Sequence, residues 1–250
     1  MRNIRFILVM SFFLLYGPPA RADNLQDLTQ RAEQGDAKAQ TDLGVKYVTG
    51  DGVASNYEAA EKWFKAAAAQ GEPLAEYNLG LMYSRGEGFP PNALEAGKWF
   101  LKSAEHGDAE ARYTLGVMYL EGYGAPRNYR QAAHWLQLAA EKGHHNAQAY
   151  LGLMHLHGLG VDKQPETAVH WLRLAAEQSN PLAQYELGLC YESGEGAPKD
   201  QEQAYVWFSL AAAQGELNAR AAMDKLETEL SASQLTKAQQ RAGEMRQINH

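Results

Sequence analysis

The side chains of this sequence that could do chemistry gather in one stretch, because six of its eight histidines lie between residues 134 and 170. They are His134, His144, His145, His155, His157 and His170. A zinc site needs three or four donors about 2.0–2.1 Å from the ion. No two of these histidines are four residues apart, which is the spacing that places two ligands on one helix face. The sequence therefore predicts surface histidines without a metal or cofactor, and a metal site is the alternative.

Nucleophilic catalysis finds no support in the sequence. Cys190 is the single cysteine, so no disulfide can form within one chain, and no histidine lies between residues 179 and 214 to activate its thiol. Ser233 and Lys237 are four residues apart, whereas the acylating Ser-x-x-Lys motif places them three apart. Carboxylates are plentiful in a chain of net charge −7, but no pair stands out. We expect a protein that is not an enzyme and, since it is acidic without a basic stripe, one that does not bind nucleic acid.

Pairs of glycines in the pattern Gly-x-Gly recur five times, from Gly50 and Gly52 to Gly194 and Gly196. Such a pair could cradle a phosphate, but the dinucleotide fingerprint needs a third glycine and a preceding strand. Here the third glycine is missing and a helical pattern precedes each pair. The glycines are thus predicted to end one helix and to turn the chain.

The glycine pairs belong to a repeat of 36 residues that runs without a gap from residue 35 to residue 214. Its five copies are residues 35–70, 71–106, 107–142, 143–178 and 179–214. When the five copies are aligned, each position of the repeat forms a column of five residues. One column consists of glycines: Gly44, Gly80, Gly116, Gly152 and Gly188. Another holds all five tryptophans of the chain: Trp63, Trp99, Trp135, Trp171 and Trp207. A fixed period of this length is typical of stacked supersecondary units.

Each copy is predicted to form two helices. In the first copy, Ala39, Leu43 and Tyr47 follow at four-residue steps and form one apolar stripe of a helix. An asparagine or aspartate such as Asn56 can cap a second helix, on which the tryptophan is expected to be buried. Gly44 falls within the first helix, where glycine is up to about 1 kcal/mol less favourable than alanine. Its return in every copy indicates a close helix crossing, and so predicts an all-α solenoid of stacked antiparallel helical hairpins.

This pattern resembles the Sel-one-like repeat, a relative of the tetratricopeptide repeat. The resemblance rests on Ala-x-x-x-Leu-Gly-x-x-Tyr, then Gly-x-Gly, then Ala-x-x-Trp-x-x-x-Ala-Ala, and it covers residues 35–214. Small departures are His155 for tyrosine, Ser103 for alanine and Ser179 for the closing glycine. The resemblance implies a right-handed superhelix that acts as a non-catalytic scaffold and binds proteins or peptides.

The alternative function is that of a cell-envelope enzyme or a binder of cell-wall ligands of the peptidoglycan or β-lactam type. A branch of the same family, with a cysteine pair in each repeat, has been linked to cell-wall-like ligands. This chain has one cysteine and departs from that branch. A compact pocket with convergent ionisable groups on one copy would favour the alternative, whereas an open groove would favour the scaffold.

The first 22 residues are predicted to be a cleaved export signal. Arg2 and Arg5 precede an uncharged apolar run, and Ala20-Arg21-Ala22 offers a cleavage site. The run is shorter than the roughly 20 residues that span a bilayer. We therefore expect a periplasmic or secreted protein that has no membrane anchor after cleavage.

The segments that flank the repeats are predicted to be caps. Residues 23–34 should form an N-terminal capping helix, because they resemble the second half of a copy. Residues 215–250 should form C-terminal capping helices, the first from about Leu217 to Leu230. The second should begin at a capping box of Ser231 and Gln234 and end near Met245.

A partner surface is predicted on the first helix of each copy. On a wheel of 100° per residue, the columns that start at residues 38, 42 and 49, flanked by the column of residue 46, are left exposed on the concave side. The predicted contact residues are Asn78, Met82, Arg85, Thr114, Met118, Glu121, Tyr150, Met154, His157 and Glu186. The methionines could instead fill space between helices. The expected partner is an unidentified protein or peptide of the cell envelope.

Overall fold

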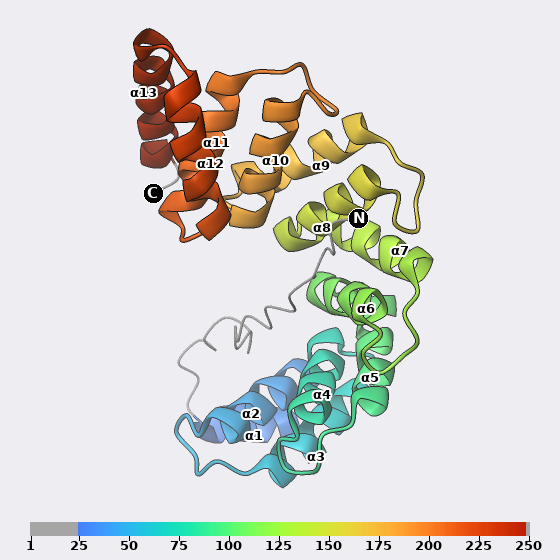
Figure 1. Ribbon diagram of the computed structural model, residues 1–250. Helices are drawn as coiled ribbons and strands as arrows, with labels where there is room; N and C mark the ends of the chain where they lie inside the picture. Colours follow the sequence, from blue (N-terminus) through green and yellow to red (C-terminus); the bar gives the residue numbers. More distant parts are fainter. Residues whose placement is uncertain (1–24, 249–250) are drawn as a thin grey trace. The chain divides into compact units, whose positions relative to one another are not determined.

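A computed structural model of the chain describes residues 25–248, which form thirteen α-helices and no β-strand (Figure 1). The predicted export signal, residues 1–22, lies outside the described residues. The helices are α1 (Leu25–Glu33), α2 (Ala37–Thr49), α3 (Tyr57–Ala68), α4 (Pro73–Arg85), α5 (Ala93–Glu105), α6 (Ala109–Glu121), α7 (Tyr129–Ala140), α8 (His145–His157), α9 (Pro165–Glu177), α10 (Pro181–Ser193), α11 (Gln201–Ala213), α12 (Leu217–Glu229) and α13 (Ala232–Ile248).

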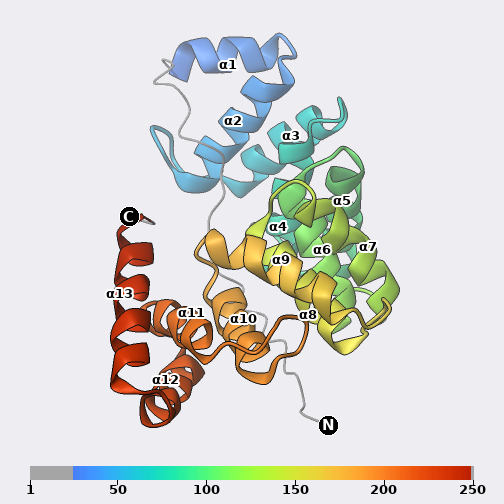
Figure 2. The ribbon, with the colours of Figure 1, turned by 90° about the horizontal axis from the view of Figure 1, so that it is seen from above.

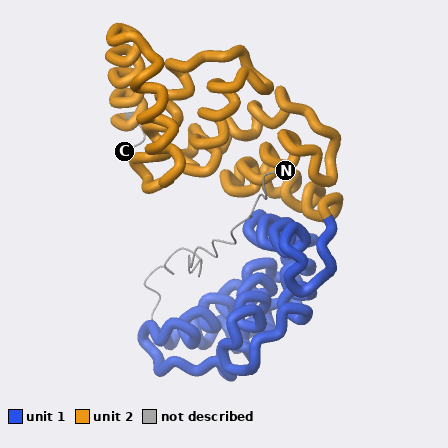
Figure 3. Tube along the Cα trace, viewed as in Figure 1, with its two compact units in different colours: residues 1–128 blue, residues 129–250 orange. Residues whose placement is uncertain are grey.

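The chain divides into two compact units, the first ending at Asn128 and the second beginning at Tyr129 (Figure 3). In the first unit, α2 with α3 and α4 with α5 form antiparallel hairpins (Figure 1). In the second unit, α8 with α9 and α10 with α11 do the same (Figure 2). Two helices per copy are therefore present as the repeat predicts.

The ends of the helices are fixed by the residues that the sequence singles out. Asn56 Oδ1 accepts a hydrogen bond of 3.0 Å from the backbone N–H of Ala59 and so caps α3. The first helix of the same hairpin, α2, ends at Gly50. This glycine takes a left-handed conformation, with φ of 75°, and its N–H donates to the backbone carbonyl of Lys46. This conformation favours glycine, and it confirms that the first glycine of the pair ends a helix.

In four of the five copies, the glycine within the first helix lies at a close crossing with the second helix of the same hairpin. A Cβ atom on Gly80 would be 2.5 Å from the ring of Phe100, and one on Gly152 would be 2.7 Å from Leu172. The same contact joins Gly44 to Phe64 and Gly188 to Phe208. No side chain fits at such distances, so the close crossing predicted from the glycine column is confirmed at these four positions.

The tryptophan column is not the centre of the core, which corrects the prediction of buried indoles. Trp63, Trp99, Trp135 and Trp171 are half-buried, and only Trp207 is buried among the five. The next residue in each copy is fully buried instead: Phe64, Phe100, Leu136, Leu172 and Phe208. In the four copies with the close crossing, that residue faces the glycine. The neighbouring tryptophan is 100° away on the helix and lies at the edge of the contact.

In three copies, a buried glutamine joins the first helix both to the preceding helix and to the end of the same copy. Gln40 donates to the carbonyl of Ala32 at 3.0 Å and accepts from Gln70 at 2.9 Å. The same pair recurs as Gln148 with Gln178 and as Gln184 with Gln214, at 2.7 and 2.8 Å. In the second copy, Glu76 and His106 stand at these positions, and Glu76 Oε2 lies 2.7 Å from His106 Nδ1.

Two further helices, α12 and α13, follow the repeats. Ser231 and Gln234 form the capping box, with the backbone N–H of Ser231 donating to Gln234 Oε1 at 3.1 Å. The helix that it starts, α13, runs to Ile248, which is slightly farther than the predicted Met245. Ala238 and Ala242 of α13 are buried in the cluster that contains α11, so this helix covers the apolar face of the last repeat.

Candidate interaction surface

The predicted contact residues come from four first helices, α4 and α6 in the first unit and α8 and α10 in the second. Six of the ten are at least partly exposed: Arg85, Thr114, Glu121, Tyr150, His157 and Glu186. The other four are buried: Asn78, Met82, Met118 and Met154. The prediction that these four form an exposed contact strip is wrong.

The methionines are buried because their column faces the neighbouring helices rather than solvent. Met118 follows Ala111 by seven residues, and seven steps of 100° bring the two side chains to within about 20° of each other on the helix. Ala111 is buried, and the methyl group of Met118 lies 3.3 Å from the position of a Cβ on Gly97 of α5. Met82 and Met154 are as deeply buried at 1% and 0% exposure. The methionines therefore fill space between helices, which was the alternative reading.

Asn78 of α4 is also buried, and its polar side chain makes no hydrogen bond that would compensate for the loss of water. Its side chain is 1% exposed, and neither its amide nitrogen nor its amide oxygen has a hydrogen-bond partner among the described residues. A buried polar group left unpaired is destabilising by about 1–3 kcal/mol. Asn78 thus weakens the first unit and cannot contact a partner in this conformation.

In the first unit, the exposed part of the surface combines one cation with hydroxyl and carboxylate groups. Arg85 lies at the end of α4, and its guanidinium is 3.6 Å from the carboxylate of Glu87. Thr114 of α6 is hydrogen-bonded to the hydroxyl of Tyr77, whose pKa is raised above its ordinary value mainly by burial. Glu121 ends α6. The buried tyrosine holds Thr114 in place, while Arg85 and Glu121 keep charged groups at the surface.

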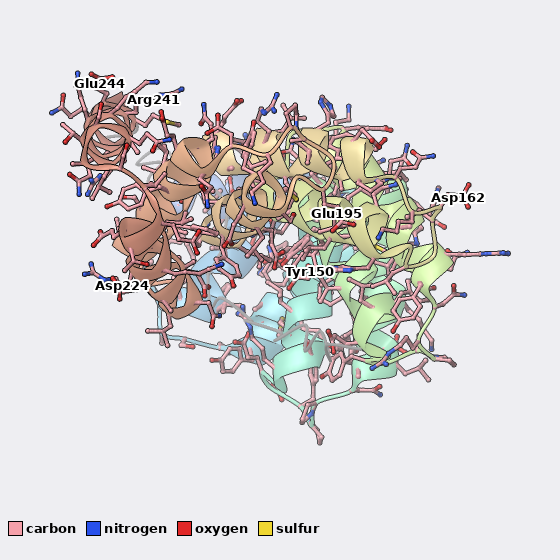
Figure 4. The ribbon with its side chains drawn as sticks, turned by 45° about the horizontal axis from the view of Figure 1, so that its top comes forward. Tyr150, Asp162, Glu195, Asp224, Arg241 and Glu244 are labelled. Carbon is pink, nitrogen blue, oxygen red and sulfur yellow. The ribbon has the colours of Figure 1, made fainter. Side chains whose placement is uncertain are left out.

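In the second unit, the exposed residues are Tyr150 of α8 (Figure 4), His157 of the same helix and Glu186 of α10. Loss of hydration lowers the pKa of His157 below its ordinary value, and the carboxylate of Glu195 partly opposes this effect. The same carboxylate pairs with Lys163 at 2.8 Å. This part of the surface therefore offers an aromatic ring, a neutral imidazole near pH 7 and a carboxylate.

The remaining candidates for chemistry stay separate from one another. Cys190 is 2% exposed, and burial raises the pKa of its thiol to about 12, so the reactive thiolate is disfavoured. His134 and His170 are exposed and pack edge-on against the tryptophans that follow them. Among the described residues, no group of three or more histidine, cysteine or acidic side chains is arranged to hold a metal ion. Within the same residues, no helix has the length and apolar character of a membrane span.

Comparison with known proteins identifies the repeat. The Sel1 repeat matches residues 37–72, 73–108, 109–144, 145–180 and 181–216. The chain belongs to the Sel1 repeat family. Members of this family are in general non-catalytic scaffolds of the kind that mediates protein–protein interaction.

Solved structures give the same result for the fold of this Sel1 repeat chain. It is similar to c5321, a protective antigen present in uropathogenic Escherichia coli strains that displays an SLR fold, with 35% identity and a TM-score of 0.79 over 87% of this chain and 47% of that one. It is also similar to a Sel1 repeat protein from Oxalobacter formigenes, with 37% identity and a TM-score of 0.72 over 79% of each chain. The fold is therefore the all-helical solenoid of this family.

A shorter similarity links the Sel1 repeat chain to the secretory immunoglobulin A-binding protein EsiB of Escherichia coli O6:H1. The two are 36% identical over 67 residues, which is 26% of this chain and 14% of EsiB. The Sel1 repeat chain thus matches less than half the length of c5321 and a small part of EsiB.

Proposed function

We propose that this chain is a non-catalytic Sel1 repeat scaffold that binds a protein or peptide through the exposed residues of its first helices. One observation carries the proposal. The packing columns of the repeat hardly change, whereas the column of residue 42 carries a different residue in each copy. Asn78 of this column is buried, and the other four residues are partly exposed: Asp42, Thr114, Tyr150 and Glu186. Positions that the fold does not constrain are those at which a partner can be specified.

The relatives support a role in binding. EsiB is described as a binder of secretory immunoglobulin A, and c5321 as a protective antigen. We propose a protein partner for this chain on that basis, with secretory immunoglobulin A as the first probe and an extract of the native cell envelope as the second. Secretory immunoglobulin A serves here only as a probe, and the proposal names no specific partner protein.

The proposal is tested on the second unit by changing Tyr150, His157 and Glu186 together to alanine. We expect capture of the probe to weaken at least tenfold while the far-ultraviolet circular dichroism stays that of the parent. A matched control changes His134, His170 and Glu177 to alanine, which are exposed on second helices. Equal capture by both triple variants would remove the first-helix surface from the proposal.

We also propose that the chain is exported, because residues 1–22 have the pattern of a cleaved signal. Cell fractionation followed by mass spectrometry of the N-terminus should find the chain outside the cytoplasm and beginning at Asp23. Full-length chain in the cytoplasm would contradict export. The enzyme alternative has no comparable support, since the ionisable groups described above do not converge on one copy.

A further inference from the structure

The second helix of the fifth repeat, α11, is covered on a side that stays exposed in the repeat before it. Residues 204–211 of α11 are all buried, whereas Arg173 on the matching helix α9 is exposed. The difference arises because α12 and α13 both pack on α11 at the C-terminal end of the second unit (Figure 1). The packing at this junction is therefore set by side chains that the repeat does not prescribe.

The three helices leave an open cavity of about 550 Å³ between them. Its walls come from the second half of α11, one face of α12 and two side chains of α13. Apolar groups form a large part of these walls: Ala212, Ala213, Leu217 and Met223. The volume lies in the range of sites that hold small molecules.

Ser209 of α11 is the side chain whose small size leaves this room. The other copies carry longer side chains at the same position: Lys65, Leu101, Gln137 and Arg173. Those four residues are at least partly exposed, whereas Ser209 is 7% exposed and belongs to the cavity wall. A longer side chain at residue 209 would therefore occupy space that the serine leaves open.

The hydroxyl of Ser209 has no hydrogen-bond partner among the described residues. Other helical hydroxyls donate to the carbonyl four residues earlier, as those of Thr41, Ser193 and Thr236 do at 2.8–2.9 Å. Ser209 does not make this bond, although it also lies within a helix. A buried hydroxyl without a partner is unfavourable. Its position in a cavity wall is explained if a molecule in the cavity supplies the partner.

The apolar wall of the cavity begins at an exposed leucine. Leu217, the first residue of α12, is 86% exposed, while Met223 of the same helix is buried. An apolar molecule that covers Leu217 removes it from water, which is favourable in proportion to the apolar area buried. The cavity thus combines an apolar wall with one open hydroxyl.

The polar side chain one turn before Ser209 already has its partners. The hydroxyl of Tyr205 donates to Glu227 at 2.9 Å and accepts from Gln239 at 3.4 Å. These bonds tie α11 to α12 and to α13. Ser209 is therefore the group of α11 in this wall that is left to bond a molecule in the cavity.

The charged groups around the cavity balance one another. Two arginines and two glutamates line it: Arg220, Arg246, Glu216 and Glu227. Arg220 also lies 3.1 Å from the carboxylate of Asp224, which is not part of the wall. Because the formal charges of the wall cancel, the cavity favours neither an anion nor a cation.

We propose that this cavity binds a small uncharged molecule with an apolar body and one hydrogen-bonding group, such as an alcohol or a phenol. The apolar body packs on Leu217 and Met223, and the polar group bonds the hydroxyl of Ser209. A hydroxyl suits this role because it can both donate to the serine and accept from it. The site lies on α11, α12 and α13, whereas the proposed partner surface lies on first helices of the repeats, so either can fail without the other.

The test compares phenol with toluene, which has nearly the same shape and lacks the hydroxyl. Each is titrated into the purified, nitrogen-15-labelled protein, and we expect saturable shifts of the amide signals of Ser209 and Leu217 with both. Ser209→Ala keeps the space and removes the hydroxyl. Its affinity for phenol should therefore be about fivefold weaker, while its affinity for toluene should stay within about twofold of the parent.

Two further variants serve as controls. Ser209→Leu introduces the side chain that the second copy carries as Leu101, and it should abolish binding of both molecules by filling the cavity. Ser193→Ala removes an exposed hydroxyl that is bonded to Leu189, and it should bind both molecules like the parent. Thermal denaturation checks that each variant is folded. If Ser209→Leu does not fold, Ser209→Ala decides the outcome.

Three results would overturn the proposal. Phenol that causes no saturable shift at Ser209 and Leu217 would remove the site. An equal loss of affinity for phenol and toluene in Ser209→Ala would remove the hydrogen bond. Benzoate carries a charge on the same ring, and tighter binding of benzoate than of phenol, lost in Arg246→Gln, would contradict the choice of an uncharged ligand.

Discussion

Gly80 of α4 lies so close to Phe100 of α5 that a Cβ atom at residue 80 would be 2.5 Å from a ring carbon. The ring is 2% exposed and cannot move into solvent without opening the core. Gly80→Ala should therefore overpack the crossing, which outweighs the gain in helix propensity and lowers the free energy of unfolding by about 1–2 kcal/mol. Urea denaturation measures the change. An alanine variant as stable as the parent would show that the hairpin opens at little cost.

Gly243 of α13 is the matched control for the crossing. It also lies within a helix, but an added Cβ would meet nothing within 4 Å. Gly243→Ala should raise the free energy of unfolding by up to about 1 kcal/mol, because alanine is the better helix former and no contact opposes it. The two substitutions are chemically identical, so a difference in sign isolates the close approach of Phe100.

Ser179 takes a left-handed conformation, with φ of 63°, at the position where the preceding copy has Gly143, with φ of 87°. This backbone conformation is unfavourable by roughly 1–2 kcal/mol for a residue with a Cβ. Ser179→Gly should stabilise the second unit by about 1 kcal/mol, and Gly143→Ser should destabilise it by a similar amount. Thermal denaturation of the two variants gives the comparison. Shifts of the same sign in both would contradict the backbone explanation.

The sequence predicts the hairpins well because five copies repeat the same local information. A glycine at the position of Gly44 is ambiguous in one helix, but its return in every copy indicates a crossing. A helical wheel cannot say which neighbour covers a face, since it refers to one helix alone. Met118 was therefore predicted on an exposed flank, although α5 covers it. The same limit made Trp135, rather than the adjacent Leu136, the predicted core residue.

The candidate sites divide in a similar way. The residues at columns 42 and 49 could be assigned from the wheel, and all of those predicted except Asn78 keep some exposure. The column of residue 46 could not, because the helices that cover it are known only from the fold, and Met82, Met118 and Met154 of this column are buried.

Glu76 and His106 provide a prediction about a buried hydrogen bond. The Glu76 side chain is 2% exposed, and its Oε2 lies 2.7 Å from His106 Nδ1. His106→Ala removes this partner and should lower the free energy of unfolding by about 1–3 kcal/mol, because the buried side-chain oxygen of Glu76 loses its hydrogen bond. Changing both residues to glutamine installs the pair found as Gln70 with Gln40 and should recover most of the loss. A double variant no more stable than His106→Ala would refute the equivalence of the pairs.

Cys190 of α10 provides a chemical probe of the fold. Burial, aided by the negative charge of Glu186 and Glu195, raises the pKa of its thiol to about 12. Thiolate is the form that reacts with iodoacetamide, so the folded protein at pH 8.5 should be alkylated far more slowly than the denatured protein. Mass spectrometry of the labelled cysteine follows the reaction. Labelling at the rate of a free thiol without denaturant would contradict the burial of this side chain.

The same shift of pKa fixes how Cys190 affects stability as pH rises. An unfolded cysteine has a pKa of about 8.5, so above that pH the unfolded chain loses the thiol proton while the folded chain keeps it. The unfolded state then binds fewer protons, and the free energy of unfolding falls with increasing pH. Cys190→Ala should flatten this decline between about pH 8.5 and 10, because the group that titrates only in the unfolded chain is gone. Denaturation curves of both proteins across this range measure the difference, and parallel declines would assign the pH dependence to other groups.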